Sequence, residues 1–172
     1  MILIPLVVLV VVTCAGCLES DYDKLPANIR NFHQSVLNIQ ADMNLLEMMK
    51  YTKELQDGYI KDSSSAYVVS VIDQAVPAYQ RYLQKLGEDD IKLGSLRVPK
   101  GFEDAEYEWR QASVERIAAA KAMVDGLTYA NEHQYEANGA FNNALDEFVG
   151  HMEKARDFDN AAIVTFGKKA YR

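Results

Sequence analysis

The sequence predicts an all-α protein: an antiparallel four-helix bundle that follows an N-terminal signal peptide. Four separate segments carry apolar residues at alternating spacings of three and four, the period of an amphipathic helix. No segment sustains the alternation of apolar and polar residues that is typical of a strand. Turn-forming residues separate the segments too often for one continuous two-helix coiled coil, and no internal repeat suggests a solenoid. A bundle is the remaining way to bury four amphipathic faces.

Charge divides the chain into two unequal parts. The 172 residues include 18 Lys and Arg and 25 Asp and Glu, a net charge of −7, and none of these charges lies in residues 1–17. The composition, 49% hydrophobic and 25% charged, is ordinary for a globular domain and argues against global disorder. An acidic balance also argues against nucleic acid as a partner, because phosphate binding needs a basic surface.

The uncharged leader has the length and apolarity of a signal peptide. Residues 2–12 are all apolar, and the small residues Ala15 and Gly16 precede Cys17. Small residues before a cysteine suit a peptidase with a narrow cleft. Pro5, the lack of polar alternation and the terminal position argue against a buried element of the fold. An uncleaved N-terminal membrane anchor remains the alternative, because the uncharged stretch is close to the length that spans a bilayer.

Ala15-Gly16-Cys17 resembles the lipobox of prokaryotic lipoproteins. The resemblance covers residues 1–17 and implies cleavage between Gly16 and Cys17, with diacylglycerol attached to the thiol of Cys17. It also implies a protein tethered to the cell membrane and facing out of the cytoplasm. We therefore expect a signal peptide over residues 1–16, a lipidated cysteine and polar tether over 17–25, and the helical domain over 26–172. Both cysteines lie in the leader, so the rest of the chain cannot form a disulfide.

The first two helical segments have clear apolar faces. Pro26 suits the first turn of a helix whose pattern weakens after residue 46 and stops near Asp57-Gly58. Ser63-Ser64-Ser65 offers N-cap hydroxyls for the second helix, which we expect to bend at Pro77 and to end at Gly87. The two predicted faces are Ile29, Phe32, Val36, Ile39, Met43 and Leu46, and Val69, Ile72, Val76, Tyr79, Leu83 and Leu86.

The last two helices follow the longest predicted loop, residues 88–101. Acidic residues at 103–108 favour a helix start there, and Lys168, Lys169 and Arg172 suit a helix end. The turn between the two helices is predicted at Asn138-Gly139, with 131–134 as the alternative. The predicted faces are Trp109, Ala112, Ile117, Ala120, Val124 and Leu127, and Phe141, Leu145, Phe148, Met152, Ala155, Phe158, Ala162 and Phe166.

No residue pattern indicates an enzyme, a metal centre or a cofactor. The histidines, His33, His133 and His151, form neither Glu-x-x-His nor His-x-x-x-His, so a di-iron bundle is not indicated. The chain has no Gly-x-Ser-x-Gly, no cysteine nucleophile in the helical domain and no phosphate-binding glycine loop. We interpret the acidic run at 88–90 as a solvated loop.

Tyrosines are the most plausible contact residues. Tyr79 and Tyr82 follow Pro77, and Tyr129 and Tyr135 lie near the turn between the last two helices. Amphipathic rings at such places suit a ligand or partner surface, although they also suit the edge of a core. We expect a binding or scaffold module of the cell envelope that contacts the membrane through lipid on Cys17 and, as a second partner, an envelope protein. The alternative is a carrier that holds a small ligand between helices, in a pocket lined by Tyr and Met. The sequence leaves the oligomeric state open.

Overall fold

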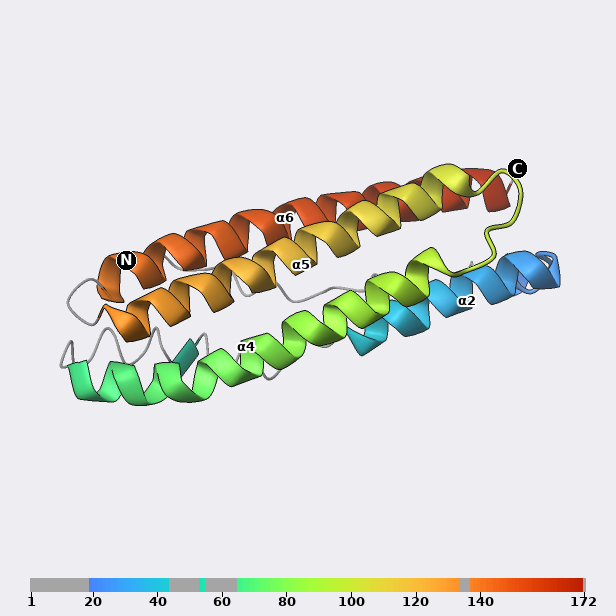
Figure 1. The fold of residues 1–172 in the computed structure, drawn as a ribbon. Coiled ribbons are helices and arrows are strands. Elements are labelled where there is room, and N and C mark those ends of the chain that lie inside the picture. The colour runs from blue at the N-terminus through green and yellow to red at the C-terminus, as the bar shows by residue number, and fades with distance from the viewer. Residues whose placement is uncertain (1–18, 44–52, 55–64, 134–136, 172) are drawn as a thin grey trace.

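The computed structural model describes residues 19–43, 53–54, 65–133 and 137–171, and within them it confirms the all-α four-helix bundle (Figure 1). The four long helices are α2 (Ala27–Asp42), α4 (Ser65–Gly94), α5 (Glu103–Glu132) and α6 (Ala137–Ala170). A short helix, α1 (Glu19–Tyr22), precedes them. No strand occurs in the described ranges.

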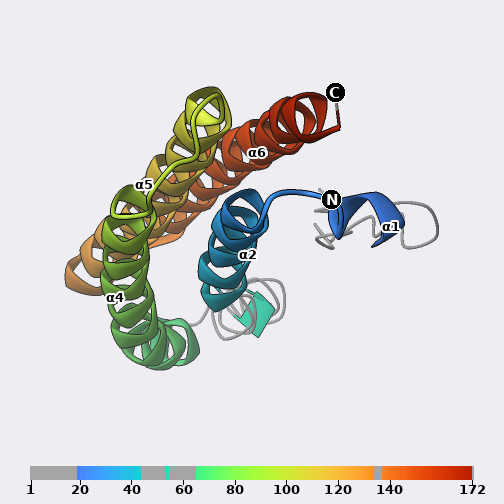
Figure 2. The same ribbon diagram turned by 90° about the vertical axis from the view of Figure 1, so that its right-hand side faces the viewer.

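Consecutive long helices run in opposite directions. Figure 1 shows α4, α5 and α6 lying lengthwise, with α5 between its two neighbours along the chain. The shorter α2 packs only where α4 ends, α5 begins and α6 ends, and Figure 2 shows it between α4 and α6. We call this part of the molecule the α2 end, and the part where α4 starts and α5 ends the opposite end.

The predicted apolar faces form the core. Every predicted face contributes residues with less than 9% exposure to one continuous apolar cluster. Its largest members that the sequence predicted are Phe32, Val36, Ile39, Met43, Ile72, Tyr79, Leu86, Trp109, Leu127, Phe141 and Phe166. Leu46 and the residues near Asp57-Gly58 lie outside what the structure describes. Within the described ranges α2 ends at Asp42, earlier than the predicted end near residue 57.

The prediction that Gly87 ends the second helix was wrong, because α4 continues to Gly94. A glycine inside a helix costs about 1 kcal/mol, which tertiary packing can outweigh. Here the burial of Leu93 outweighs that cost, because Leu93 is 1% exposed and lies two turns beyond Leu86 on the same helix face. The predicted solvated loop at 88–90 is therefore helical, and Asp89 within it is fully buried.

Pro77 lies inside α4, as predicted. The helix continues past it, and in Figure 1 α4 changes direction partway along its length. A bend is expected where proline removes an N–H and its ring meets the preceding turn.

The turn between the last two helices follows the alternative prediction. Helix α5 ends at Glu132, the N–H of His133 bonds to the carbonyl of Tyr129 at 2.9 Å, and α6 begins at Ala137. Asn138 and Gly139 are therefore inside α6. The segment expected as a plain polar tether is also partly folded, because it contains α1 and the buried Leu25.

Candidate functional site

The structure separates the tyrosines that the sequence singled out. Tyr79 is fully buried and Tyr82 is 7% exposed, so both belong to the core of α4. Tyr129 is 42% exposed at the opposite end of the bundle. Tyr135 lies outside the described residues. Of the three described tyrosines, Tyr129 alone reaches a surface that a partner could contact.

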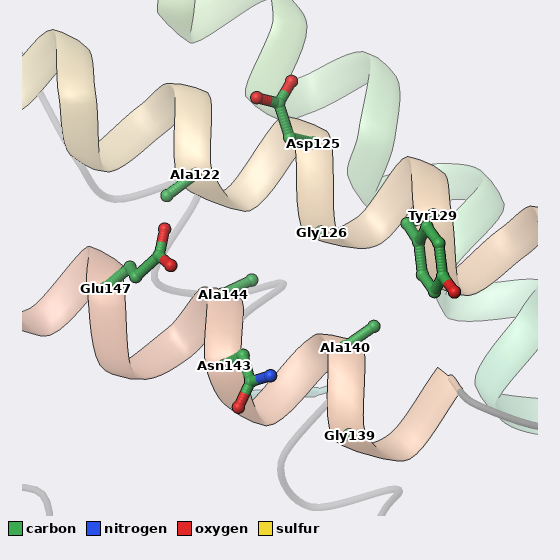
Figure 3. Close-up of a pocket in the computed structure, with 9 residues that line it drawn as sticks. All are labelled: Ala122, Asp125, Gly126, Tyr129, Gly139, Ala140, Asn143, Ala144 and Glu147. Carbon is green, nitrogen blue, oxygen red and sulfur yellow. The ribbon is translucent and has the colours of Figure 1, made fainter.

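Tyr129 lines a groove of about 630 Å³ between α5 and α6 (Figure 3). We call it the α5/α6 groove. The rest of its lining is Ala122, Asp125 and Gly126 from α5 and Gly139, Ala140, Asn143, Ala144 and Glu147 from α6. In Figure 3 the Tyr129 ring extends from α5 towards α6, and the Glu147 carboxylate rises from α6 towards Ala122. The methyl groups of Ala140 and Ala144 lie between them.

The groove exists because small residues bring the two helices close together. A Cβ added to Gly126 would overlap the Cβ of Ala144 and would lie 3.3 Å from the carbonyl oxygen of Ala140. The backbones can approach this closely only when neither side chain is large. The same small side chains leave the outer side of the contact hollow, with a carboxylate and a tyrosine on its rims.

The groove carries negative charge. Asp125 and Glu147 are its two ionisable carboxylates, and no Lys or Arg is among the lining residues. Asp125 pairs with Lys121 one turn away at 2.5 Å, and in Figure 3 its carboxylate points away from α6. Tyr129 stacks on His133 with ring centroids 4.1 Å apart. Glu147 is therefore the carboxylate that faces across the groove, and a cationic group is its natural counterpart.

A second polar cluster lies inside the bundle, where three helices meet. The Nε2 of Gln40 on α2 donates to Oδ1 of Asp159 on α6 at 2.9 Å. The guanidinium of Arg116 on α5 donates to Oδ2 of the same carboxylate. The side chains of Arg116 and Asp159 are 10% and 15% exposed, so the pair is largely buried. One carboxylate thus connects α2, α5 and α6.

Burial controls the ionisation of this cluster. It raises the pKa of Asp159, against the opposing attraction of Arg116 and the hydrogen bonds from Arg116 and Gln40. Burial also strongly raises the pKa of Tyr82, which Arg116 lowers and Asp89 raises by smaller amounts. The phenol of Tyr82 consequently stays neutral across the physiological range.

Several buried polar atoms near these residues have no hydrogen-bond partner among the described residues. They include the hydroxyls of Tyr82 and Ser113 and Oδ2 of Asp89. The other oxygen of Asp89 accepts from Lys92 at 2.7 Å. The sequence pattern missed this interior, because it assigned Ile117 and Phe158 to the buried faces of α5 and α6. In the structure Ile117 is partly exposed, and the neighbouring Arg116 lies on the buried face of α5.

The histidines are apart from one another. His151 is partly exposed, and its Nδ1 lies 2.6 Å from the carboxylate of Glu115. His133 is exposed, and His33 on α2 lies among aromatic rings from other helices. No group of three or more His, Cys, Asp or Glu side chains in the described ranges could hold a metal ion.

The leader residues Gly16 and Cys17 lie outside the described residues. No helix in the part that is described is long and apolar enough to cross a membrane. No family model matches the chain, and no curated protein or solved structure is significantly similar to it.

Proposed function

We propose that the protein is a lipid-anchored binding module that faces out of the cytoplasm and contacts an envelope protein through the α5/α6 groove. The observation that carries the proposal is the position of this groove relative to α1. Helix α1, the first described element after Cys17, lies at the α2 end of the bundle, whereas the groove lies at the opposite end (Figure 1).

The distance between the two ends favours this arrangement. The ring of His33 near the start of α2 stacks on Phe166, and Ala144 in the groove lies 22 residues earlier on α6. At 1.5 Å per residue this separation is roughly 33 Å along the helix. A chain tethered at Cys17 would therefore present the groove away from the lipid surface, where another protein can reach it.

The chemistry of the groove favours a slim, basic segment of the partner. The floor is formed by alanine and glycine, which admit an extended chain or a helix with small side chains. Glu147 supplies charge for a Lys or Arg, and Tyr129 supplies an aromatic edge. The expected carrier pocket of Tyr and Met has no support in this lining, which contains one tyrosine and no methionine.

The lipid anchor has a direct test. Mass spectrometry of the membrane fraction should find a mature chain that begins at Cys17 and carries diacylglycerol on its thiol. Cys17→Ser should leave an unprocessed precursor. Cys14→Ser is the matched control, because it changes a cysteine of the same leader and should still be processed. Native protein that retains Met1 would contradict lipidation and would favour the uncleaved anchor.

The binding face is tested separately by photocrosslinking in intact cells. A photoreactive residue at Asn143 in the groove should capture one discrete protein, and Glu147→Lys should abolish the capture. The control position is Gln80, an exposed residue of α4 outside the groove lining. Equal capture from both positions would mean that the groove is not the binding face.

A further inference from the structure

An aromatic box surrounds the imidazole of His33 on α2. The ring stacks on Phe166 of α6, with centroids 4.3 Å apart and planes inclined by 15°. The ring centroid of Trp109 on α5 lies 6.0 Å from that of His33, and the centroid of Tyr22, the last residue of α1, lies 5.6 Å from it. One side chain of α2 therefore contacts α1, α5 and α6 through rings alone.

The box offers no partner for a charged imidazole. Nδ1 of His33 is buried without a hydrogen-bond partner. The groups that face His33 from α5 and α6, Trp109 and Phe166, are uncharged, and Tyr22 of α1 uses its hydroxyl to donate to the carbonyl of Arg30 at 3.2 Å. Burial alone lowers the pKa of His33, and no neighbouring charge contributes. His33 is partly exposed, and a proton on its ring would create a partly buried cation whose Nδ1 has no counterion beside it.

Helix α2 depends on few polar contacts to stay in place. Besides the box, its hydrogen bond to another helix in the described ranges is the one from Gln40 to Asp159. Its apolar contacts come from one face, which includes Phe32, Val36 and Ile39. Because the box lies near the start of α2 and next to α1, it holds the described part of the bundle that follows the leader in the sequence.

We propose that His33 is an acid-sensitive latch: the neutral imidazole holds α1 and α2 against α5 and α6, and protonation releases them. This inference does not depend on the identity of a partner or on lipidation. Release would loosen the connection between the leader and α4, α5 and α6 while leaving those three helices packed. It would also uncover the apolar surface that α2 now covers, next to Trp109 and Phe166.

The sign of the effect follows from proton linkage. When α2 is released, His33 titrates near its ordinary pKa of 6.5, whereas in the box its pKa is lower. Between these two values the released state binds more protons, so docking weakens as the pH falls. Asp159 acts in the opposite direction, because its pKa is raised in the folded state and acid therefore favours its buried form.

The test is hydrogen exchange on the full chain in detergent micelles at pH 7.5 and pH 5.5, corrected for intrinsic exchange rates. Protection of the α2 amides should fall at the lower pH by up to about tenfold, the ratio of charged to neutral imidazole one pH unit below 6.5. Protection of the central amides of α5 should be unchanged. Trp109, the only tryptophan of the chain, provides a second signal, because its fluorescence should change over the same pH range.

Substitutions at three positions separate the latch from other acid effects. His33→Phe keeps a stacked ring without a proton to bind, and it should remove the pH dependence of α2 protection. His33→Gln should do the same if the phenylalanine variant folds poorly. His151→Gln and Asp159→Asn should keep the response to acid. The proposal fails if His33→Phe responds to pH like the unmodified chain, if α2 and α5 lose protection equally, or if acid strengthens α2 protection through cation–π contact with the box.

Discussion

The two ends of the bundle are built from the same helical period but are held together by different interactions. At the α2 end, aromatic rings and a buried ion pair fill the space between helices. At the opposite end, α5 and α6 touch through Gly126 and Ala144, with a groove on the outer side. The difference teaches that an apolar period predicts which face of a helix is buried, whereas the size and charge of individual residues decide how two helices meet.

The largest expected effect breaks the polar cluster near the α2 end. Asp159→Ala would leave the guanidinium of Arg116 largely buried without its carboxylate, and it would remove the acceptor of Gln40. Loss of one partner of a buried pair costs about 3–5 kcal/mol, and we expect about 3 kcal/mol because both side chains keep some exposure. Urea denaturation, followed by circular dichroism, measures this free energy.

Two further variants give the result its meaning. Asp157→Ala changes the same residue type on the same helix, but its side chain is 71% exposed, so the loss should stay within about 0.5 kcal/mol. The double variant Arg116→Met, Asp159→Leu should recover most of the lost stability, because it removes both charges together. A double variant as unstable as Asp159→Ala would show that the loss comes from packing and not from the unpaired charge.

The second prediction breaks the close contact at the opposite end. Gly126→Ala should destabilise the protein by about 2 kcal/mol, since the added methyl overlaps Ala144 and forces the helices apart. Gly87→Ala is the matched control, because its Cβ would meet nothing within 4 Å. That control should stabilise the protein by about 0.5–1 kcal/mol through helix propensity. Adding Ala144→Gly to Gly126→Ala should restore much of the loss in thermal denaturation, and a failure to do so would locate the strain elsewhere.

The sequence was sufficient to predict the helices and most of the core residues. The predicted faces supplied Ile72, Leu86, Trp109 and Phe166, because an apolar period of 3.6 residues leaves one stripe to bury. It was less reliable at helix ends. Glycine at position 87 predicts a helix end, but Tyr79, Leu86 and Leu93 repeat every seven residues and indicate that the buried face continues past it.

The candidate sites were largely hidden in the sequence. Gly126 marks the close contact, but its partner Ala144 could not be found without knowing how α5 and α6 are aligned along their axes. The same alignment places Arg116 beside Asp159, 43 residues away, and His33 among rings from three other helices. The position of Tyr82 after Pro77 suggests a contact residue, but the ring belongs to the core, which the sequence does not indicate.

The third prediction uses that buried phenol. Because burial raises the pKa of Tyr82 in the folded state above the ordinary value of 10, the folded state keeps a proton that the unfolded state loses above pH 10. Stability should therefore fall as the pH rises above 10, by up to about 1.4 kcal/mol per pH unit from this group. Comparing urea denaturation of the unmodified chain and Tyr82→Phe between pH 9 and pH 11 isolates that slope. Tyr107→Phe, at a 60% exposed position, should retain the full slope.

The smallest expected effect is a gain in stability from a buried serine. Ser113 has no solvent-accessible surface, and its Oγ makes no hydrogen bond within the described part of the chain. Ser113→Ala removes this desolvated hydroxyl and introduces a better helix former, so the free energy of unfolding should rise by about 1 kcal/mol. Ser95→Ala is the control, because the Ser95 hydroxyl donates to the carbonyl of Lys92 at 2.7 Å and its removal should bring no gain. A loss of stability in Ser113→Ala would show that the hydroxyl has a partner when the protein is in water, and the polar interior near the α2 end would then be a site that binds water and not a set of isolated groups.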